Sequence, residues 1–417
     1  MTRVLLVGNG AREHALARAL KASGIDIVAH MDRQNPGIAA LADEISIGST
    51  TDFKHLPTLH DIDYAVIGPE APLYAGVSDF ITDNGVPCVA PSKRCAMIET
   101  SKSFARAVLD KVAPDANPTY MVARSLDDFR KFAKSVDVMN MVVKPNGLTG
   151  GKGVKIAGEH LRSEKEVKKY VYDLLVKTGV VVLEERLEGT EFTVQAFVDG
   201  QNIQTMPLVR DYKRAYDGDE GPNTGSMGSF SREDHGLSYV LEEDLARAKE
   251  IMSHAVPQIK KSAGHEYRGI LYGQFMKTAQ GVKVIEFNAR FGDPEALNVL
   301  PLLETSFDDV CRSIIEGNLI PVKFRRKATV CVYLVPEGYP NDSVAKDNRI
   351  AVPEDLTCDI FYASVYERGE DVFTTGSRSI GVLGMGNTVA EAREVAYQNA
   401  ARIQGKIRYR TDIALGE

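Results

Sequence analysis

A carboxylate, an amide and a guanidinium stand at alternate positions in the segment VIEFNARFGDP, as Glu286, Asn288 and Arg290. Alternate residues of an extended strand point to one face, so these groups would share a face while the apolar residues between them pack behind. Mg²⁺ prefers oxygen ligands and completes its shell with water and phosphate oxygens. The segment therefore predicts a magnesium site at Glu286 and Asn288, with Arg290 placed to neutralise a transferring phosphoryl group. The alternative, a polar edge strand facing solvent, is disfavoured by the hydrophobic run that ends in glycine.

The segment KPNGLTGGKGV, which begins at Lys144, has the residues of a phosphate-binding loop. Gly150, Gly151 and Gly153 surround Lys152 and would form a mobile cradle for an anion. It is not a P-loop, because the GxxxxGK[ST] spacing fails and no hydroxyl group is supplied for magnesium. A plain flexible hairpin is the alternative.

The turn GNGARE follows the first predicted strand and opens a helix. Gly8 and Gly10 would let backbone N–H groups approach an anion at the helix N-terminus, and Arg12 favours a phosphate. The dinucleotide fingerprint requires a third glycine where Glu13 stands, although Asp32 suits a nicotinamide nucleotide. A tight turn without a ligand is the other alternative.

Two further stretches offer groups to a nucleotide or an anion. Residues 184–187 (EERL) end an apolar strand, and their backbone could meet a purine edge while Glu191 accepts from ribose hydroxyls. Residues 211–214 (DYKR) and 221–228 (GPNTGSMG) form a basic loop with many backbone amides, which suits a lid over an anion site better than idle coil.

These groups must be positioned by several domains of α/β and α+β type. The first hundred residues alternate predicted strands with amphipathic helices, which indicates a parallel sheet whose ligands bind at the carboxyl ends of its strands. The turns at 8–10 and 68–72 lie at such ends. The predicted strands are 4–7, 25–29, 64–67 and 86–90, and the predicted helices are 12–22 and 76–84.

The remaining chain is expected to form three more units. We predict a catalytic domain from residues 101–117 and 190–320, a small lid from 118–189 and a C-terminal α+β domain from 321–417, beside an N-terminal domain from 1–100. Their expected elements are a helix at 101–112 capped by Ser101, strands at 139–144 and 180–184, a helix at 163–177, a long polar loop at 211–229, and a final antiparallel sheet with a helix at 388–404.

Composition limits the class of protein. The chain has 417 residues and a formal charge of −7, which argues against binding nucleic acid mainly through phosphate neutralisation. No apolar run approaches the ~18 residues that span a bilayer, so we expect neither an anchor nor a signal peptide. The five cysteines are scattered without a CxxC pair, which suits free thiols in a reducing cytoplasm.

Taken together, the motifs resemble those of the phosphoribosylamine–glycine ligase family, in the ATP-grasp superfamily. They occur in family order over about three quarters of the chain, and GPNTGxMG and EFNxRFGDPE are specific to this family. The matching segments are GNGAREHAL from Gly8, NPG from Asn35, IGPEAPL from Ile67, SKSFAR from Ser101, GLTGGKGV from Gly147, DYKRAYDGDEGPNTGSMG from Asp211 and IEFNARFGDPE from Ile285.

The resemblance implies a reaction in which ATP phosphorylates the carboxylate of glycine and the amine of 5-phosphoribosylamine attacks the acyl phosphate. Catalysis would then consist of positioning and charge neutralisation. The implied partners are these small molecules, with no nucleic acid, no membrane and a monomeric chain. The implied ATP site has Lys102, Lys144 and Gly150–Gly153 at the phosphates, Glu184, Glu185, Arg186 and Leu187 at adenine, and Glu191 at the ribose. The implied ligands of Mg²⁺ or Mn²⁺ are Glu286 and Asn288, and the implied catalytic residues are Arg290, Lys213 and Asp211. The implied binding residues for the acceptor substrates are Gly8, Asn9, Gly10, Arg12, Gly68, Pro69, Glu70, Asn223, Thr224 and Gly225.

The chain departs from the family pattern at a few positions. Ser226 replaces a glycine, and Leu297 stands where a glutamine is usual after DPE. Gln274, on a predicted strand beside the metal strand, replaces an aliphatic residue and is either an oxygen ligand or a hydrogen-bonded core glutamine. These changes leave open a related ligase with another acceptor. A nicotinamide-dependent oxidoreductase and a non-catalytic nucleotide sensor are the rivals from other classes.

Overall fold

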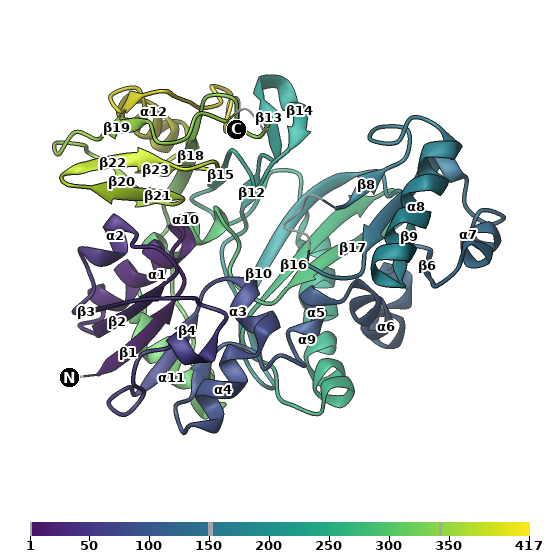
Figure 1. Cartoon of the computed structure of the whole chain (residues 1–417), viewed down its shortest axis with the longest axis horizontal. Coiled ribbons are helices and arrows are strands. Elements are labelled where there is room, and N and C mark those ends of the chain that lie inside the picture. The colour runs from purple at the N-terminus through teal and green to yellow at the C-terminus, as the bar shows by residue number, and fades with distance from the viewer. Residues whose placement is uncertain (1, 149–152, 342–343) are drawn as a thin grey trace.

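The computed structural model describes residues 2–148, 153–341 and 344–417. Its N-terminal part is a parallel five-stranded sheet in the order β3-β2-β1-β4-β5, as the alternation of strands and helices predicted (Figure 1). The polar edge strand β3 was not predicted, because it has no apolar run. The elements are β1 (Arg3–Val7), α1 (Ala11–Ala22), β2 (Asp26–Met31), α2 (Pro36–Ala39), β3 (Glu44–Ile47), β4 (Tyr64–Ile67), α3 (Glu70–Ala75), α4 (Val77–Asp83) and β5 (Cys88–Val89).

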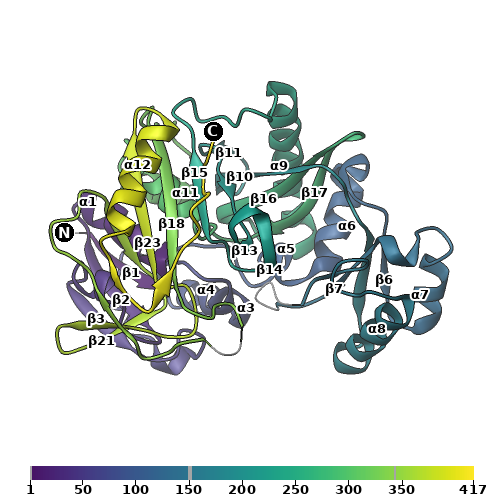
Figure 2. The ribbon, with the colours of Figure 1, turned by 90° about the horizontal axis from the view of Figure 1, so that it is seen from above.

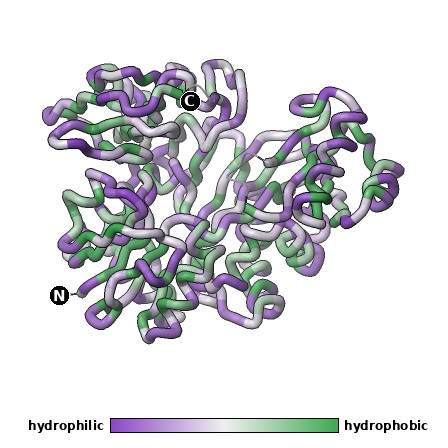
Figure 3. Tube along the Cα trace, in the orientation of Figure 1, coloured by the Kyte–Doolittle hydropathy of each residue, from purple (hydrophilic) through white to green (hydrophobic). Residues whose placement is uncertain are grey.

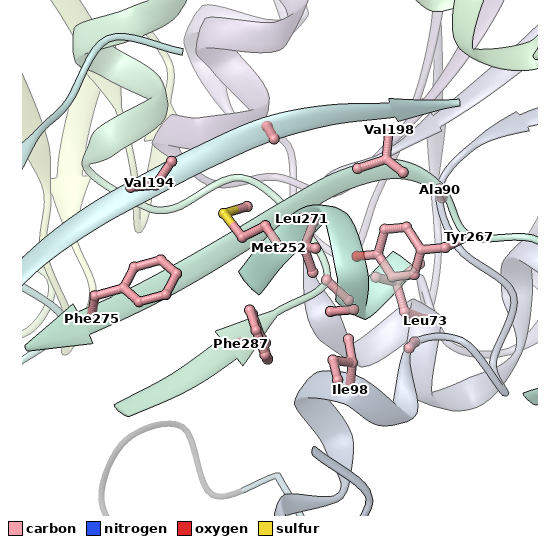
Figure 4. Close-up of a cluster of buried hydrophobic side chains, with 14 of the residues drawn as sticks. Leu73, Ala90, Ile98, Val194, Val198, Met252, Tyr267, Leu271, Phe275 and Phe287 are labelled. Carbon is pink, nitrogen blue, oxygen red and sulfur yellow. The ribbon is translucent and has the colours of Figure 1, made fainter. Parts of the chain in front are cut away.

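A four-stranded antiparallel sheet in the order β11-β10-β16-β17 forms the middle of the molecule. One of its faces is apolar and packs on α9, where Val194, Leu271, Phe275 and Phe287 meet Met252 (Figure 4). Side chains alternate along a strand, so the opposite face is left for polar residues. The elements are α5 (Met97–Thr100), α6 (Lys102–Val112, capped by Ser101 as predicted), β10 (Thr190–Asp199), β11 (Ile203–Thr205), α9 (Glu242–Ala263), β16 (Arg268–Thr278), β17 (Gly281–Asn288), α10 (Glu295–Val299) and α11 (Phe307–Glu316).

The segment predicted as a small α+β unit projects from one end of the molecule and has its own hydrophobic core (Figure 1). Its strands pair in the order β6-β9-β7-β8. Both predicted strands and the predicted helix are present within two residues of their expected bounds. The elements are β6 (Tyr120–Ala123), α7 (Leu126–Phe132), β7 (Met141–Pro145), β8 (Lys155–Ile156), α8 (Glu164–Thr178) and β9 (Val181–Glu185).

The C-terminal part contains the predicted antiparallel sheet and helix. The prediction of a long loop at 211–229 was wrong. That segment forms β12 (Arg210–Asp211), β13 (Arg214–Tyr216), β14 (Glu220–Asn223) and β15 (Gly228–Ser231). β15 pairs with β18 (Ala328–Pro336), so the segment is extended by a partner about a hundred residues away. The ribbon of β13 and β14 lies between the C-terminal part and the unit that contains β6–β9, α7 and α8, for which we predicted the role of a lid (Figure 2).

The C-terminal helix α12 (Val389–Ala400) ends four residues earlier than predicted. Residues 404 and 405 instead form β24 (Gln404–Gly405), which pairs with β19 (Arg349–Ala351). Among the described residues no helix is long and apolar enough to cross a membrane, and Figure 3 shows hydrophobic and hydrophilic segments interspersed throughout. The remaining strands are β20 (Asp359–Tyr362), β21 (Val365–Arg368), β22 (Asp371–Thr374), β23 (Ile380–Gly386) and β25 (Ile407–Arg408).

Candidate active site

The end of β17 carries the predicted metal residues. Glu286 and Asn288 point to the polar face of the central sheet, and Glu286 Oε2 lies 3.0 Å from Lys102 Nζ at the start of α6. Burial acts to raise the pKa of Glu286, but the charges of Lys102, Lys144 and Lys213 lower it to about 2. Glu286 is therefore a carboxylate at neutral pH, surrounded by ammonium groups that can also meet phosphates.

A buried ion cluster lies next to Glu286. Glu184 accepts hydrogen bonds from Arg106 Nε at 2.7 Å and Nη2 at 2.8 Å, and lies 2.7 Å from Lys144 Nζ. Lys144 also donates to the carbonyl of Ile285 at 3.2 Å. The cations hold the pKa of Glu184 low against its burial. The Glu184 side chain is thus engaged by these cations. Its partner Arg106 was not predicted, because its only sequence signal is its place in SKSFAR.

The other residues of the segment 184–187 lie at the C-terminal end of β9. The Glu185 carboxylate accepts from the backbone N–H of Thr119 at 2.8 Å, and Arg186 Nη2 lies 3.7 Å from Glu159 Oε2. Gly153 accepts a hydrogen bond from the hydroxyl of Tyr170 at 2.8 Å. Gly150, Gly151 and Lys152, which the sequence assigns to the phosphate-binding loop, lie outside the described residues.

The polar face continues across β16 to Glu191. Glu191 Oε2 accepts from Lys213 Nζ at 2.7 Å and from Gln274 Nε2 at 2.5 Å. Gln274 is buried and donates through Nε2, while its role as an oxygen ligand stays a prediction. Asp211 lies in the same group, and burial raises the pKa of Asp211 although the charge of Lys213 opposes the rise.

Arg290 lies beyond the metal strand, because β17 ends at Asn288, so the expected alternation does not reach it. Its Nη2 lies 3.1 Å from Glu99 Oε1, and its Nε lies 3.4 Å from Glu70 Oε2. Glu99 is buried and also accepts from the backbone N–H of Ala289 at 2.7 Å. Two carboxylates therefore fix the guanidinium, and Glu99 was missed because nothing in its local sequence marks it.

The two glycine turns lie at the carboxyl ends of the neighbouring parallel strands β1 and β4, as predicted, and they contact each other. Gly8 has a φ of +122°, and a Cβ there would lie 2.7 Å from both Glu13 and Pro69. The N–H of Gly10 donates to Glu13 Oε2 at 2.6 Å, and Arg12 Nε donates to Glu13 Oε1 at 2.6 Å. The N–H of Gly10 and the Nε of Arg12 are thus engaged by the Glu13 carboxylate, and the N–H of Gly8 donates to the carbonyl of His30 at 3.0 Å.

Residues of the N-terminal turns also contact the segment that follows β17. Arg12 Nη1 donates to the carbonyl of Phe291 at 3.1 Å, and its Nη2 lies 3.9 Å from Glu70. Arg290 and Arg12 lower the pKa of Glu70 to about 2 despite its burial. The backbone carbonyl of Asn9 accepts from Asn35 at 3.0 Å, and Gly68 leaves no room for a Cβ beside Glu13.

A C-terminal arginine that sequence analysis missed, Arg378, ties the loop at 221–228 to the site. It donates to the carbonyls of Gly225 at 2.5 Å, Ser226 at 3.2 Å and Asp293 at 3.0 Å. The hydroxyl of Thr224 donates to the carbonyl of Lys213 at 2.9 Å, while Asn223 is exposed at the end of β14. Thr224 therefore contacts Lys213, and Arg378 joins Gly225 to Asp293, while Asn223 pairs with Arg214 of β13.

The two remaining departures from the family pattern are structural. Ser226 has a φ of +90° and its hydroxyl donates to the carbonyl of Gly228 at 2.8 Å. Leu297 is fully buried and packs against Gly381 of β23, in the hydrophobic cluster that also contains Leu383. Leu297 therefore belongs to the packing of α10 on the C-terminal sheet.

Comparisons with known proteins show the family of the chain. The chain matches the family profiles of the phosphoribosylglycinamide synthetase N domain over residues 2–99, its ATP-grasp (A) domain over 100–296 and its C domain over 329–416. The phosphoribosylamine–glycine ligase of Methanosarcina acetivorans is 45% identical over 418 residues, covering 99% of this chain and 94% of the relative.

Solved structures extend the comparison to the fold. The crystal structure of phosphoribosylamine–glycine ligase from Thermotoga maritima superposes with a TM-score of 0.85 at 30% identity, covering 99% of this chain and 100% of that one. A biotin carboxylase complex from Campylobacter jejuni, at 14% identity and a TM-score of 0.72 over 98% of this chain and 93% of that one, shares the fold alone. The chain therefore belongs to the phosphoribosylglycinamide synthetase family, the phosphoribosylamine–glycine ligases.

Proposed function

We propose that this chain joins glycine to 5-phosphoribosylamine at the expense of ATP, giving glycinamide ribonucleotide, ADP and phosphate, a step of purine biosynthesis. A carboxylate oxygen of glycine attacks the γ-phosphorus of ATP and ADP leaves. The amine then attacks the glycyl carbonyl and phosphate leaves with that oxygen. The observation that carries the proposal is the group of ammonium ions around Glu286 on the polar face of the central sheet, in a chain of this family.

We propose that Lys102, Lys144 and the loop ending at Gly153 bind the phosphates of ATP. Both ammonium groups lie beside the metal strand, at 3.0 Å from Glu286 and 3.2 Å from the carbonyl of Ile285. Adenine would meet the backbone of residues 184–187, while the Glu184 side chain is paired with Arg106 and Lys144. Glu191, half-exposed on the same face, would accept from the ribose hydroxyls.

A divalent cation fits Glu286 and Asn288. Glu286 stays ionised, and both side chains offer oxygen atoms on one face. Among the described residues no group of three His, Cys, Asp or Glu side chains could hold a metal ion alone. The ion, Mg²⁺ or Mn²⁺, would therefore share its shell with phosphate oxygens and water, where it neutralises the charge of the transferring group.

The acceptor substrates would lie between the N-terminal turns and the loop at 221–228. Arg290, which is paired with Glu70 and Glu99, would neutralise the acyl phosphate, and Asp211 and Lys213 would assist it. Gly8–Arg12 and Gly68–Glu70 would contact the sugar phosphate, and Asn223–Gly225 would close over it. We also infer that the chain is a monomer and that it acts in the cytoplasm. The free state of all five cysteines suits the reducing conditions of that compartment.

The test is ADP release by the purified chain with MgATP, glycine and 5-phosphoribosylamine, omitting each component in turn. The proposal predicts release that needs all three, with glycinamide ribonucleotide detected by mass. Release with other carboxylates or amines but not with these would assign the chain a different acceptor.

A further inference from the structure

A buried arginine, Arg410, lies two residues after β25 in the C-terminal part. It is 1% exposed, and its Nε and Nη2 donate to the two carboxylate oxygens of Asp412 at 2.8 and 2.7 Å. Its Nη1 donates to Asp219 Oδ1 at 2.8 Å and to the backbone carbonyl of Arg214 at 3.0 Å. Buried charges are normally paired. Two of the groups that bind this charge belong to the segment of β13 and β14, so the guanidinium joins the C-terminal part to that ribbon.

Other residues of the C-terminal segment 408–412 contact the same ribbon. Arg408 Nη1 donates to the carbonyl of Ala215 at 2.8 Å, and the backbone N–H of Thr411 donates to Asp217 Oδ1 at 2.8 Å. β13 and β14 form a sheet of two strands, and a ribbon of that size is marginally stable by itself. The position of the ribbon therefore depends on the C-terminal segment.

The ribbon carries one cation toward the predicted lid and follows another that lies in the candidate site. Arg214, the first residue of β13, pairs with Glu159 of the unit that contains β6–β9. Lys213, the residue before it, donates to Glu191 at 2.7 Å. Because Arg410 binds the carbonyl of Arg214, it fixes the backbone from which both cations extend.

We propose that Arg410 is a positioning residue of the active site, which holds the β13–β14 ribbon where Arg214 meets Glu159 and Lys213 meets Glu191. The inference rests on the proposed function and deepens it, since that function assigns Glu191 and the phosphate-binding loop of the predicted lid to ATP. Arg410 acts through the ribbon, so its loss changes the affinity for ATP and not only the amount of folded protein.

The test compares the ATP KM of Arg410→Met with that of the unmodified chain, in the ADP-release assay. Methionine keeps much of the apolar length of the side chain and removes the guanidinium. Release of the ribbon predicts an ATP KM about three- to tenfold higher, because a partly exposed ion pair is lost and Lys213 is displaced. A smaller amount of folded protein would lower the apparent kcat and leave the KM unchanged. Arg402→Met, at an exposed arginine of the C-terminal part that pairs with Asp355, is the matched control and should leave the ATP KM unchanged.

A double variant shows whether Arg410 acts through the ribbon. Arg214→Met alone removes the pair with Glu159 and should raise the ATP KM at least about twofold. In Arg410→Met the ribbon is already released, so the addition of Arg214→Met should change the ATP KM by less than about 1.5-fold. Independent effects would multiply instead, and that result overturns the proposal. An ATP KM within about 1.5-fold of the unmodified value, in either single variant, also overturns it.

Hydrogen exchange of residues 214–223 measures the anchoring of the ribbon without turnover. Loss of hydrogen bonds from a charged group predicts that the ribbon opens about tenfold more often in Arg410→Met, while exchange in β18 and β23 stays within about twofold. Unchanged exchange of the ribbon overturns the proposal. If the unmodified chain makes no glycinamide ribonucleotide, the proposed function itself fails, and the exchange experiment alone decides the anchoring.

A second route avoids the buried position if Arg410→Met does not fold by circular dichroism. Asp217→Ala combined with Asp219→Asn changes two exposed carboxylates of the ribbon and leaves Arg410 paired with Asp412. This variant should raise both the ribbon exchange and the ATP KM at least about twofold. No change in either measurement overturns the proposal.

Discussion

His14 provides a prediction whose magnitude follows from its surroundings. It is 6% exposed, its ring stacks on Tyr362, and its Nδ1 accepts from the backbone N–H of Tyr362 at 3.0 Å. The contact joins α1 to β20 and requires the neutral imidazole. Burial, aided by the charge of Arg18, lowers the pKa of His14 from 6.5 to about 3.

A folded-state pKa below the unfolded one means that the unfolded chain binds more protons. The stabilisation is therefore fully present above pH 6.5 and is lost progressively as the pH falls toward 3. Between pH 7.5 and 5.0 the loss is about 2 kcal/mol, at 1.36 kcal/mol per pKa unit. Because pH 5 lies well above 3, this value depends mainly on the unfolded pKa. Carboxylates with lowered pKa values titrate mostly below this window.

The assay is hydrogen exchange of the Tyr362 amide and its segment, at both pH values and corrected for intrinsic exchange. Opening of the α1–β20 contact should become about thirtyfold more frequent at pH 5 in the unmodified chain. His14→Asn, whose Oδ1 can accept the same hydrogen bond without titrating, should show almost none of this change. His60→Asn, at an exposed histidine, should behave like the unmodified chain. Equal loss of protection in the unmodified chain and in His14→Asn would refute the reasoning.

Three further predictions concern the kinetic constants kcat and KM. Glu286→Gln should lower kcat at least about a hundredfold while circular dichroism stays unchanged, because a ligand of the metal is lost; near-normal activity of the folded variant contradicts the metal assignment. Glu191→Gln should raise the ATP KM more than the glycine KM, and steady-state kinetics giving the opposite order would remove Glu191 from the nucleotide site. Glu159, on the lid segment, pairs with Arg214 of β13. Glu159→Gln should raise the ATP KM by at most about fivefold, as expected for a partly exposed ion pair. Glu164→Gln, on the exposed lid helix, is its control and should leave that KM unchanged.

Local patterns predicted the elements that carry the site. The two-residue period of strands placed Glu286 and Asn288 on one face, and the alternation of strands and helices placed the turns at Gly8 and Gly68 together. These features depend on residues close in sequence, where backbone geometry alone decides the outcome.

The site residues and strands that could not be predicted from the sequence depend on tertiary contacts. Arg106 and Glu99 are recognisable only once α5, α6 and β17 pack together, and Arg378 comes from a separate part of the chain. The strands within 211–229 form because β18 offers a distant edge, which no local pattern reveals. Strand alternation alone does not account for the position of Arg290, because β17 ends at Asn288.

The central claim, that glycine is activated as an acyl phosphate at this site, is tested most directly with glycine labelled by ¹⁸O in its carboxylate. Attack of that carboxylate on ATP predicts one ¹⁸O atom in each inorganic phosphate released, detected by mass, and only when 5-phosphoribosylamine is present to complete turnover. Phosphate that contains no ¹⁸O, formed together with glycinamide ribonucleotide, would contradict the account.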